Sequence, residues 1–386
     1  MNRSLLLLAT CQGFFLTNSI AFMAVSGLVG FKLAPAGWLA TLPLTAYVAG
    51  SAMMTPLVAK HQRQWGRKRA FQSGLLMAML ANGGAVLAVA YDSFWWLVLS
   101  ATVAGYYQAN ASLYRFAATE VVTPDFKERA LSLVLAGGIL GAVLGPNIAN
   151  FTRNFTVVPF QGAYLALVIV AATSLATLTC IRFPDVPRDA ANTKGRSPLQ
   201  LARQPLFVMS IVSCALGYGV MNLLMAATPL AMQICGFQFS STATVLEWHV
   251  LGMFVPSFFT GMLIQRFGVL PIIASGVLLN AVCIAIALSD QDLNHFITAL
   301  LLLGIGWNFL YVGGSTLLTQ TYLPHEKITA QATVDFMVTA TMTVTSLSSG
   351  ALITTRGWEW LNAGSVVPVM VIAMVLVWVS LIQRRA

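Results

Sequence analysis

The chain is a series of long apolar stretches separated by short polar segments. A helix needs about 20 mostly apolar residues to cross the hydrocarbon core of a bilayer. Twelve stretches meet this requirement. They are residues 5–28, 38–59, 70–91, 94–117, 130–151, 163–181, 206–232, 242–264, 269–288, 296–318, 328–353 and 361–382. The pattern predicts an all-α integral membrane protein with twelve transmembrane helices.

A polar gap divides these helices into two groups of six. We take residues 1–181 as an N-terminal six-helix bundle, 182–205 as a linker and 206–386 as a C-terminal six-helix bundle. The linker is rich in proline and charge, which is typical of a tether between packed units. An internal repeat supports the division, because Trp65 and Gly66 after helix 2 are matched 202 residues later by Phe267 and Gly268 after helix 8.

Composition agrees with a membrane protein and disagrees with a water-soluble enzyme. The chain is 58% hydrophobic and 9% charged, with a mean hydropathy of +0.78, whereas soluble domains are about 25% charged. Of its 21 Lys and Arg, 17 fall in the loops of one side and 3 in those of the other, and Arg115 lies inside helix 4. Positive loops face the cytoplasm, so we expect both termini and the linker on the cytoplasmic side. The basic balance needs no nucleic-acid partner.

No motif of an enzyme or of an ATP-driven pump occurs in the chain. GxxxxGK[ST], HExxH and GxSxG are all missing, and these motifs carry phosphate binding, zinc hydrolysis and serine catalysis. The five cysteines form no CxxC pair, so a zinc ribbon or a thioredoxin-like centre is excluded. The chain is therefore expected to be a monomeric transporter, passive or secondary, whose main surroundings are lipid.

Two short sulfur motifs are the strongest candidate chemistry. Helix 7 carries Met221 and Met225 as MxxxM, and helix 8 carries His249 and Met253 as HxxxM. Counted from the outer ends of these antiparallel helices at about 1.5 Å per residue, the four lie roughly 12 to 18 Å deep. Residues four apart share a helix face. If the two helices are adjacent, Met225 therefore lies beside His249 and Met221 beside Met253.

These four side chains form a donor set that suits copper. Thioethers and imidazole favour Cu(I) over magnesium, calcium or manganese. Neutral donors also cost little to bury in an apolar bundle. For any single methionine, ordinary packing is the simpler explanation, and it is the joint arrangement that indicates a metal site for a transported ion. Cys214 and Met232 share the Met221 face of helix 7, so we place both on the path of the ion, with Cys214 nearest the cytoplasm.

Two charged residues inside the membrane are candidates for proton or cation coupling. Asp335 lies in helix 11, where a carboxylate either takes up a proton or is a structural partner for Asn308 or Tyr311. Both readings stay open. Arg115 in helix 4 either takes part in coupling or pairs with Glu120 at the inner end of the helix. For Arg115 the structural reading is favoured.

The chain resembles the major facilitator superfamily in its two six-helix halves, its basic loop at 63–69, and its GxxxGP element of Gly141, Gly145 and Pro146. The two sulfur motifs, with 28 residues from Met221 to His249, further resemble those of the CcoA-type copper importers of that superfamily. This resemblance implies that Met221, Met225, His249 and Met253 bind copper. It also implies copper uptake across a bacterial inner membrane for the assembly of haem-copper oxidases, with copper chaperones as partners and no cofactor other than the transported ion.

Two other functions remain open from the sequence. A proton-coupled exporter of a drug or metabolite is suggested by the GxxxGP element, and a membrane copper sensor would bind metal without moving it. For a transporter we expect alternating access, with the two bundles rocking about a site near the membrane midplane.

Overall fold

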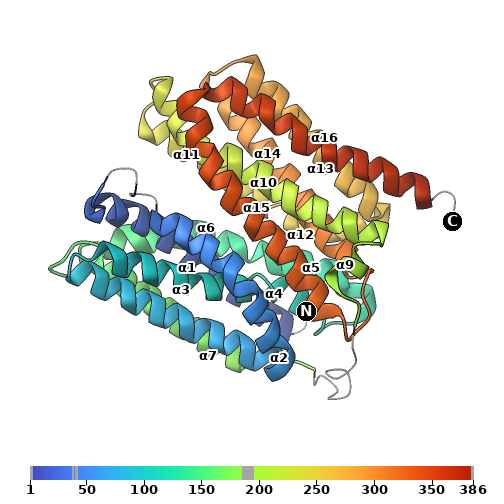
Figure 1. The fold of residues 1–386 in the computed structure, drawn as a ribbon, viewed down its shortest axis with the longest axis horizontal. Helices are drawn as coiled ribbons and strands as arrows, with labels where there is room; N and C mark the ends of the chain where they lie inside the picture. The colour runs from blue at the N-terminus through green and yellow to red at the C-terminus, as the bar shows by residue number, and fades with distance from the viewer. Residues whose placement is uncertain (1–2, 37–38, 40–41, 185–194, 384–386) are drawn as a thin grey trace. The chain divides into compact units, whose positions relative to one another are not determined.

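A computed structural model describes residues 3–36, 39, 42–184 and 195–383. Within these ranges every regular element is a helix (Figure 1). The chain divides into two compact units, Met1–Thr193 and Lys194–Ala386, and the division lies inside the predicted linker 182–205. Some predicted features lie outside the described residues, namely residue 38 at the start of helix 2 and the basic residues Arg188, Lys194, Arg384 and Arg385.

The N-terminal unit holds predicted helices 1 to 6. Its elements are α1 (Arg3–Leu33), α2 (Leu42–Ala90), α3 (Phe94–Ala111), α4 (Tyr114–Ala118), the 3-10 turn η2 (Pro124–Phe126), α5 (Lys127–Ala136), α6 (Gly138–Thr152) and α7 (Gln161–Thr179). Predicted helices 2 and 3 form the single long element α2. Within this unit α1 packs on α6 and α7, and α2 packs on α3 and α7.

The C-terminal unit holds predicted helices 7 to 12. Its elements are α9 (Pro198–Leu201), α10 (Pro205–Ile234), α11 (Phe239–Phe254), α12 (Ser257–Phe267), α13 (Val269–Ser289), α14 (Leu293–Leu318), α15 (Lys327–Thr355) and α16 (Gly357–Gln383). Helix α14 packs extensively against α10, α11 and α13, and α10 also packs against α15 and α16. This arrangement makes α14 the central helix for the candidate site.

The lengths and surfaces of the helices suit a bilayer. Among the described residues, 10 helices are long and apolar enough to span a membrane, and one of these is α2, which contains two predicted spans. Large apolar side chains such as Leu80, Ile169, Leu278 and Met374 are more than half exposed. In water such a surface is costly, whereas in lipid it is solvated. The chain is a multi-pass membrane protein.

The sequence repeat reappears as a repeated backbone turn. Gly66 interrupts α2 with φ 76° and ψ 171°, and Gly268 separates α12 from α13 with φ 88° and ψ 164°. Positive φ strains most side chains but not glycine. The same turn therefore joins helices 2 and 3 in one unit and helices 8 and 9 in the other, as the repeat predicts.

Three predicted helices are each divided into two elements, and helix 5 is divided at Gly137 between α5 and α6. Helix 8 ends as α11 at Phe254 and resumes as α12 at Ser257, because Pro256 has no N–H and its ring clashes with the preceding turn. Helix 4 is interrupted after Ala111, where the Ser112 hydroxyl donates back to the Ala109 carbonyl, a bond that competes with regular helix. The predicted span 94–117 is interrupted at Ser112, whereas the predicted span 242–264 corresponds to one apolar stretch, Thr244–Phe267, long enough to cross a membrane.

Glycines let the neighbours of α14 approach closely. A Cβ atom at Gly304 would collide with the His249 carbonyl oxygen on α11, and one at Gly314 would lie 2.7 Å from the Cys214 sulfur on α10. Small residues permit this kind of tight helix packing in membranes. The backbone of α11 at His249 is therefore held directly against α14.

Candidate functional site

His249 lies at the centre of the candidate site with its ring completely buried. Its Nδ1 atom is 2.8 Å from the Leu300 carbonyl oxygen on α14. A carbonyl only accepts hydrogen bonds, so Nδ1 must carry the proton and donate it. In the neutral ring Nε2 is then the bare lone pair, and this buried atom has no partner among the described residues.

Met253 follows His249 by one turn of α11 and is 7% exposed. Its carbonyl oxygen accepts a 2.7 Å hydrogen bond from the side chain of Asn308 on α14. The two residues of the HxxxM motif are thus both fixed on α14, one through its ring and the other through its backbone. Ligand positions held by neighbouring hydrogen bonds in this way are typical of metal sites.

Met221 and Met225 belong to α10. Met221 is buried at 3% exposure and Met225 is partly buried. The sequence pattern assumes that helices 7 and 8 are adjacent, but α10 and α11 make few contacts and both pack mainly on other helices, notably α14. The two helices nevertheless touch each other, so the pairing of Met225 with His249 and of Met221 with Met253 stays a prediction. The convergence of all four side chains on one ion stays a prediction.

Cys214 and Met232, the residues predicted on the ion path, are both fully buried in α10. The Cys214 thiol lies 3.7 Å from the Tyr311 carbonyl oxygen and 3.8 Å from the Ser315 hydroxyl. The α10 face at Cys214 therefore packs against α14, whereas the sequence pattern places Cys214 on the path of the ion. A role for either residue in ion passage stays a prediction.

An aromatic cluster lies on this part of α14, and its central residue, Trp307, was not singled out by the sequence pattern. Trp307 stacks on Tyr311 with ring centroids 5.0 Å apart and an angle of 17°. It meets Tyr218 of α10 and Phe254 of α11 edge-on at 5.4 and 6.0 Å. The buried Trp307 Nε1 has no partner among the described residues. The available signal was the spacing of Trp307 and Tyr311, which places both on one face of α14.

The two candidate coupling residues are buried in different units. Asp335 is 3% exposed in α15, and Asn308, one of its two proposed partners, is bonded to α11 and α12. Arg115 is 1% exposed and donates a 2.5 Å hydrogen bond to the Ser112 carbonyl at the break in helix 4. This bond supports the structural reading of Arg115, and coupling through either residue stays a prediction.

Glu120, the proposed partner of Arg115, forms an ion pair with Arg67. Its carboxylate lies 2.7 Å from the Arg67 guanidinium. This pair joins the turn between α2's two spans to the segment that follows α4. It gives the basic loop at 63–69 a structural partner within the N-terminal unit.

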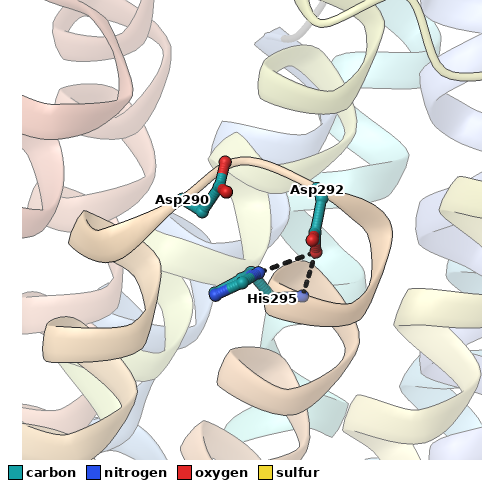
Figure 2. A group of neighbouring side chains, drawn as sticks. All are labelled: Asp290, Asp292 and His295. Carbon is teal, nitrogen blue, oxygen red and sulfur yellow. Dashed lines mark hydrogen bonds and ion pairs between the residues drawn. The ribbon is translucent and has the colours of Figure 1, made fainter.

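A second group of metal-ligating side chains lies at the start of α14. Figure 2 shows Asp290, Asp292 and His295, whose ligand atoms all lie within 4.8 Å of one another. Asp292 caps α14, because its carboxylate accepts hydrogen bonds from the His295 backbone N–H at 2.8 Å and from the His295 ring at 2.7 Å. These bonds, the backbone one first, lower the pKa of Asp292. Helix capping accounts for Asp292 and His295 without a metal.

Comparison with known proteins identifies the class of this molecule as a membrane transporter and not an enzyme. The sequence model of the Major Facilitator Superfamily matches residues 4–247 and 211–386. The chain belongs to this superfamily. The fold agrees with this membership. It is similar to that of the human organic anion transporter MFSD10 (TM-score 0.79, 13% identity, 97% of this chain and 99% of that one). It is also similar to the Escherichia coli fucose:proton symporter FucP (TM-score 0.75, 13% identity, 98% of each chain).

Relatives with related sequences cover nearly the whole chain. The riboflavin transporter RfnT of Brucella anthropi is 36% identical over 365 residues, covering 93% of this chain and 91% of that protein. The uncharacterized transporter YddS of Bacillus subtilis is 26% identical over 366 residues, covering 90% and 84%. Neither is named as a copper transporter, so the resemblance to CcoA-type importers continues to depend on the two sulfur motifs.

Proposed function

We propose that this secondary or passive transporter imports copper across a bacterial inner membrane by alternating access. The single observation that carries the proposal is the His249 ring, whose Nδ1 is bonded to the Leu300 carbonyl and whose buried Nε2 lone pair has no described partner. An unpaired buried acceptor is costly. A soft cation at Nε2 relieves this cost, and the fixed tautomer leaves the ligating nitrogen free for it.

The residues around His249 favour copper over harder ions. Met253 is one turn away on the same helix, and Met221 and Met225 offer two further thioethers on α10. Such ligands are soft, so they suit Cu(I). They are also neutral, so no charge on the ligands repels the ion or holds it too tightly for release. Inward movement of one positive charge gains about 2.3 kcal/mol per 100 mV of inside-negative potential. Uptake of the ion therefore needs no ATP, and proton coupling through Asp335 is optional.

The proposal also includes the orientation of the chain, its partners and the use of the imported copper. Both termini are cytoplasmic, copper is the substrate and not a resident cofactor, and the partners are copper chaperones on either side of the membrane. The protein acts as a monomer, and the imported copper supplies the assembly of haem-copper oxidases.

Riboflavin transport is the second candidate. It is favoured by the 36% identity with RfnT and by the aromatic cluster at Trp307, whose indole N–H has no partner among the described residues and lies beside stacked rings. A flat heterocycle with carbonyl groups would match such a surface, because aromatic rings stack in offset or edge-on arrangements. The riboflavin site of this second candidate would occupy the same central part of α14 as the proposed copper site.

One transport experiment separates the two candidates. Cells that lack their own copper and riboflavin importers would produce the chain, and uptake of radioactive copper and of labelled riboflavin would be measured side by side. We expect saturable copper uptake and no riboflavin uptake above cells with an empty vector. Riboflavin uptake without copper uptake would replace our proposal with the second candidate, and uptake of neither would reject both.

A further inference from the structure

The break in helix 8 is bridged by a single side chain from another helix. Pro256 supplies no N–H to the carbonyl four residues earlier, so the helical ladder is interrupted between α11 and α12. Asn308 on α14 lies directly at this interruption and is completely buried. Its side chain bonds to residues of both α11 and α12.

Asn308 contacts both sides of the break with its amide group. Its Nδ2 donates to the Met253 carbonyl at 2.7 Å and to the Ser257 hydroxyl at 2.5 Å. Its Oδ1 accepts a 2.7 Å hydrogen bond from the Thr260 hydroxyl. The donors therefore hold the end of α11 and the start of α12, and the acceptor holds α12 one turn further on.

These bonds fix the backbone at one of the proposed copper ligands. One turn earlier on α14, Gly304 lies against the His249 carbonyl and the Met253 amide nitrogen. Residues 304–308 of α14 thus contact the backbone of the HxxxM turn at both His249 and Met253. Because Pro256 interrupts the helix just beyond Met253, these contacts with α14 add to the hydrogen bonds of α11 in fixing the backbone at Met253.

We propose that Asn308 is a positioning residue for copper transport, which sets the place of the Met253 thioether by binding the Met253 carbonyl across the break. The inference rests on the proposed function, since it takes Met253 as a copper ligand. Asn308 itself does not touch the ion. Residues that orient ligands in this way typically contribute about 10- to 100-fold to metal affinity.

The test is a double-mutant cycle on copper uptake. Asn308→Leu removes all three hydrogen bonds with little change in volume, and Met253→Leu removes the thioether. We expect Asn308→Leu alone to raise the KM for copper about tenfold with little change in maximal rate. In the Met253→Leu background, Asn308→Leu should raise KM no further. Each measured uptake rate is divided by the amount of folded protein in the membrane, which gives the rate per transporter molecule.

Asn362→Leu is the matched control. Asn362 is equally buried in α16, but within the described part of the chain it donates only to its own helix, at the Trp358 carbonyl, so its replacement should leave the KM unchanged. If Asn308→Leu does not accumulate, Asn308→Asp takes its place, because a carboxylate keeps the acceptor for Thr260 and loses the donors to Met253 and Ser257.

The outcomes separate this inference from the proposed function. An unchanged KM in the Asn308 variant, or an equal rise in both backgrounds, overturns the positioning role while leaving copper transport in place. Wild-type copper kinetics in Met253→Leu instead remove Met253 from the site, and with it the proposed metal assignment.

Discussion

Replacement of His249 by asparagine tests the role of one ring nitrogen, Nε2, while the role of the other, Nδ1, is kept. The asparagine amide nitrogen can take the place of Nδ1 and donate to the Leu300 carbonyl, which His249 does now at 2.8 Å. Nothing in asparagine replaces Nε2. His249→Asn therefore keeps a contact worth about 1 kcal/mol and removes the proposed copper ligand.

The size of the effect follows from the number of ligands. Structural metal sites with four protein ligands bind with roughly 10–16 kcal/mol, which is about 3 kcal/mol for each ligand. Since 1.4 kcal/mol corresponds to a factor of ten, loss of Nε2 should weaken copper binding about 100-fold. Loss of the buried unpaired acceptor also removes a cost from the empty protein, so the folded state should not be much less stable.

The assay is copper uptake at limiting concentration, together with the thermal midpoint of the purified protein. We expect uptake by His249→Asn to fall about 100-fold while the midpoint changes little. The matched control is His295→Asn, since His295 lies at the start of α14 in the group of Figure 2 and should leave uptake unchanged. Wild-type uptake by His249→Asn would refute the reasoning.

Three further predictions concern packing and charge. The Arg196 guanidinium lowers the pKa of Glu326 to about 2 from 4.5. Glu326→Gln should therefore cost on the order of 1 kcal/mol above pH 4.5, and the difference from wild type should vanish as the pH falls through 2, as denaturation curves will report. Gly304→Val should push α11 away, cost about 1–3 kcal/mol and abolish uptake, and uptake like wild type would contradict the close packing. Asp292→Ala should lower the thermal midpoint slightly through loss of the cap, and any loss of copper uptake would contradict its capping role.

The fold was largely predictable because membrane spans need only length and apolarity. The twelve stretches map onto the helices, and the equivalence of Gly66 and Gly268 reappears as a shared positive φ. The breaks were not predicted, although Pro256 gave the signal for one of them. Apolar runs in a membrane continue across such interruptions, because hydropathy does not register a missing N–H.

The candidate site was predictable only in part. Depth and periodicity singled out His249, which the structure buries completely, because an ionisable residue within an apolar span is conspicuous. They did not show that α14 packs on both α10 and α11, since a helix that is apolar all round gives no indication of its neighbours. For the same reason Asn308 was considered as a partner of Asp335, whereas it bonds to Met253 and Thr260.

Diffraction at the copper absorption edge, from crystals of the protein loaded with Cu(I), tests the central claim most directly. The account predicts one strong anomalous peak in the membrane-spanning part of the C-terminal unit, about 2 Å from His249 Nε2 by analogy with other metal–imidazole bonds, with methionine sulfur completing the coordination. Bound copper that leaves His249 Nε2 without a ligand bond, or fully loaded crystals with no peak near α11, would contradict it.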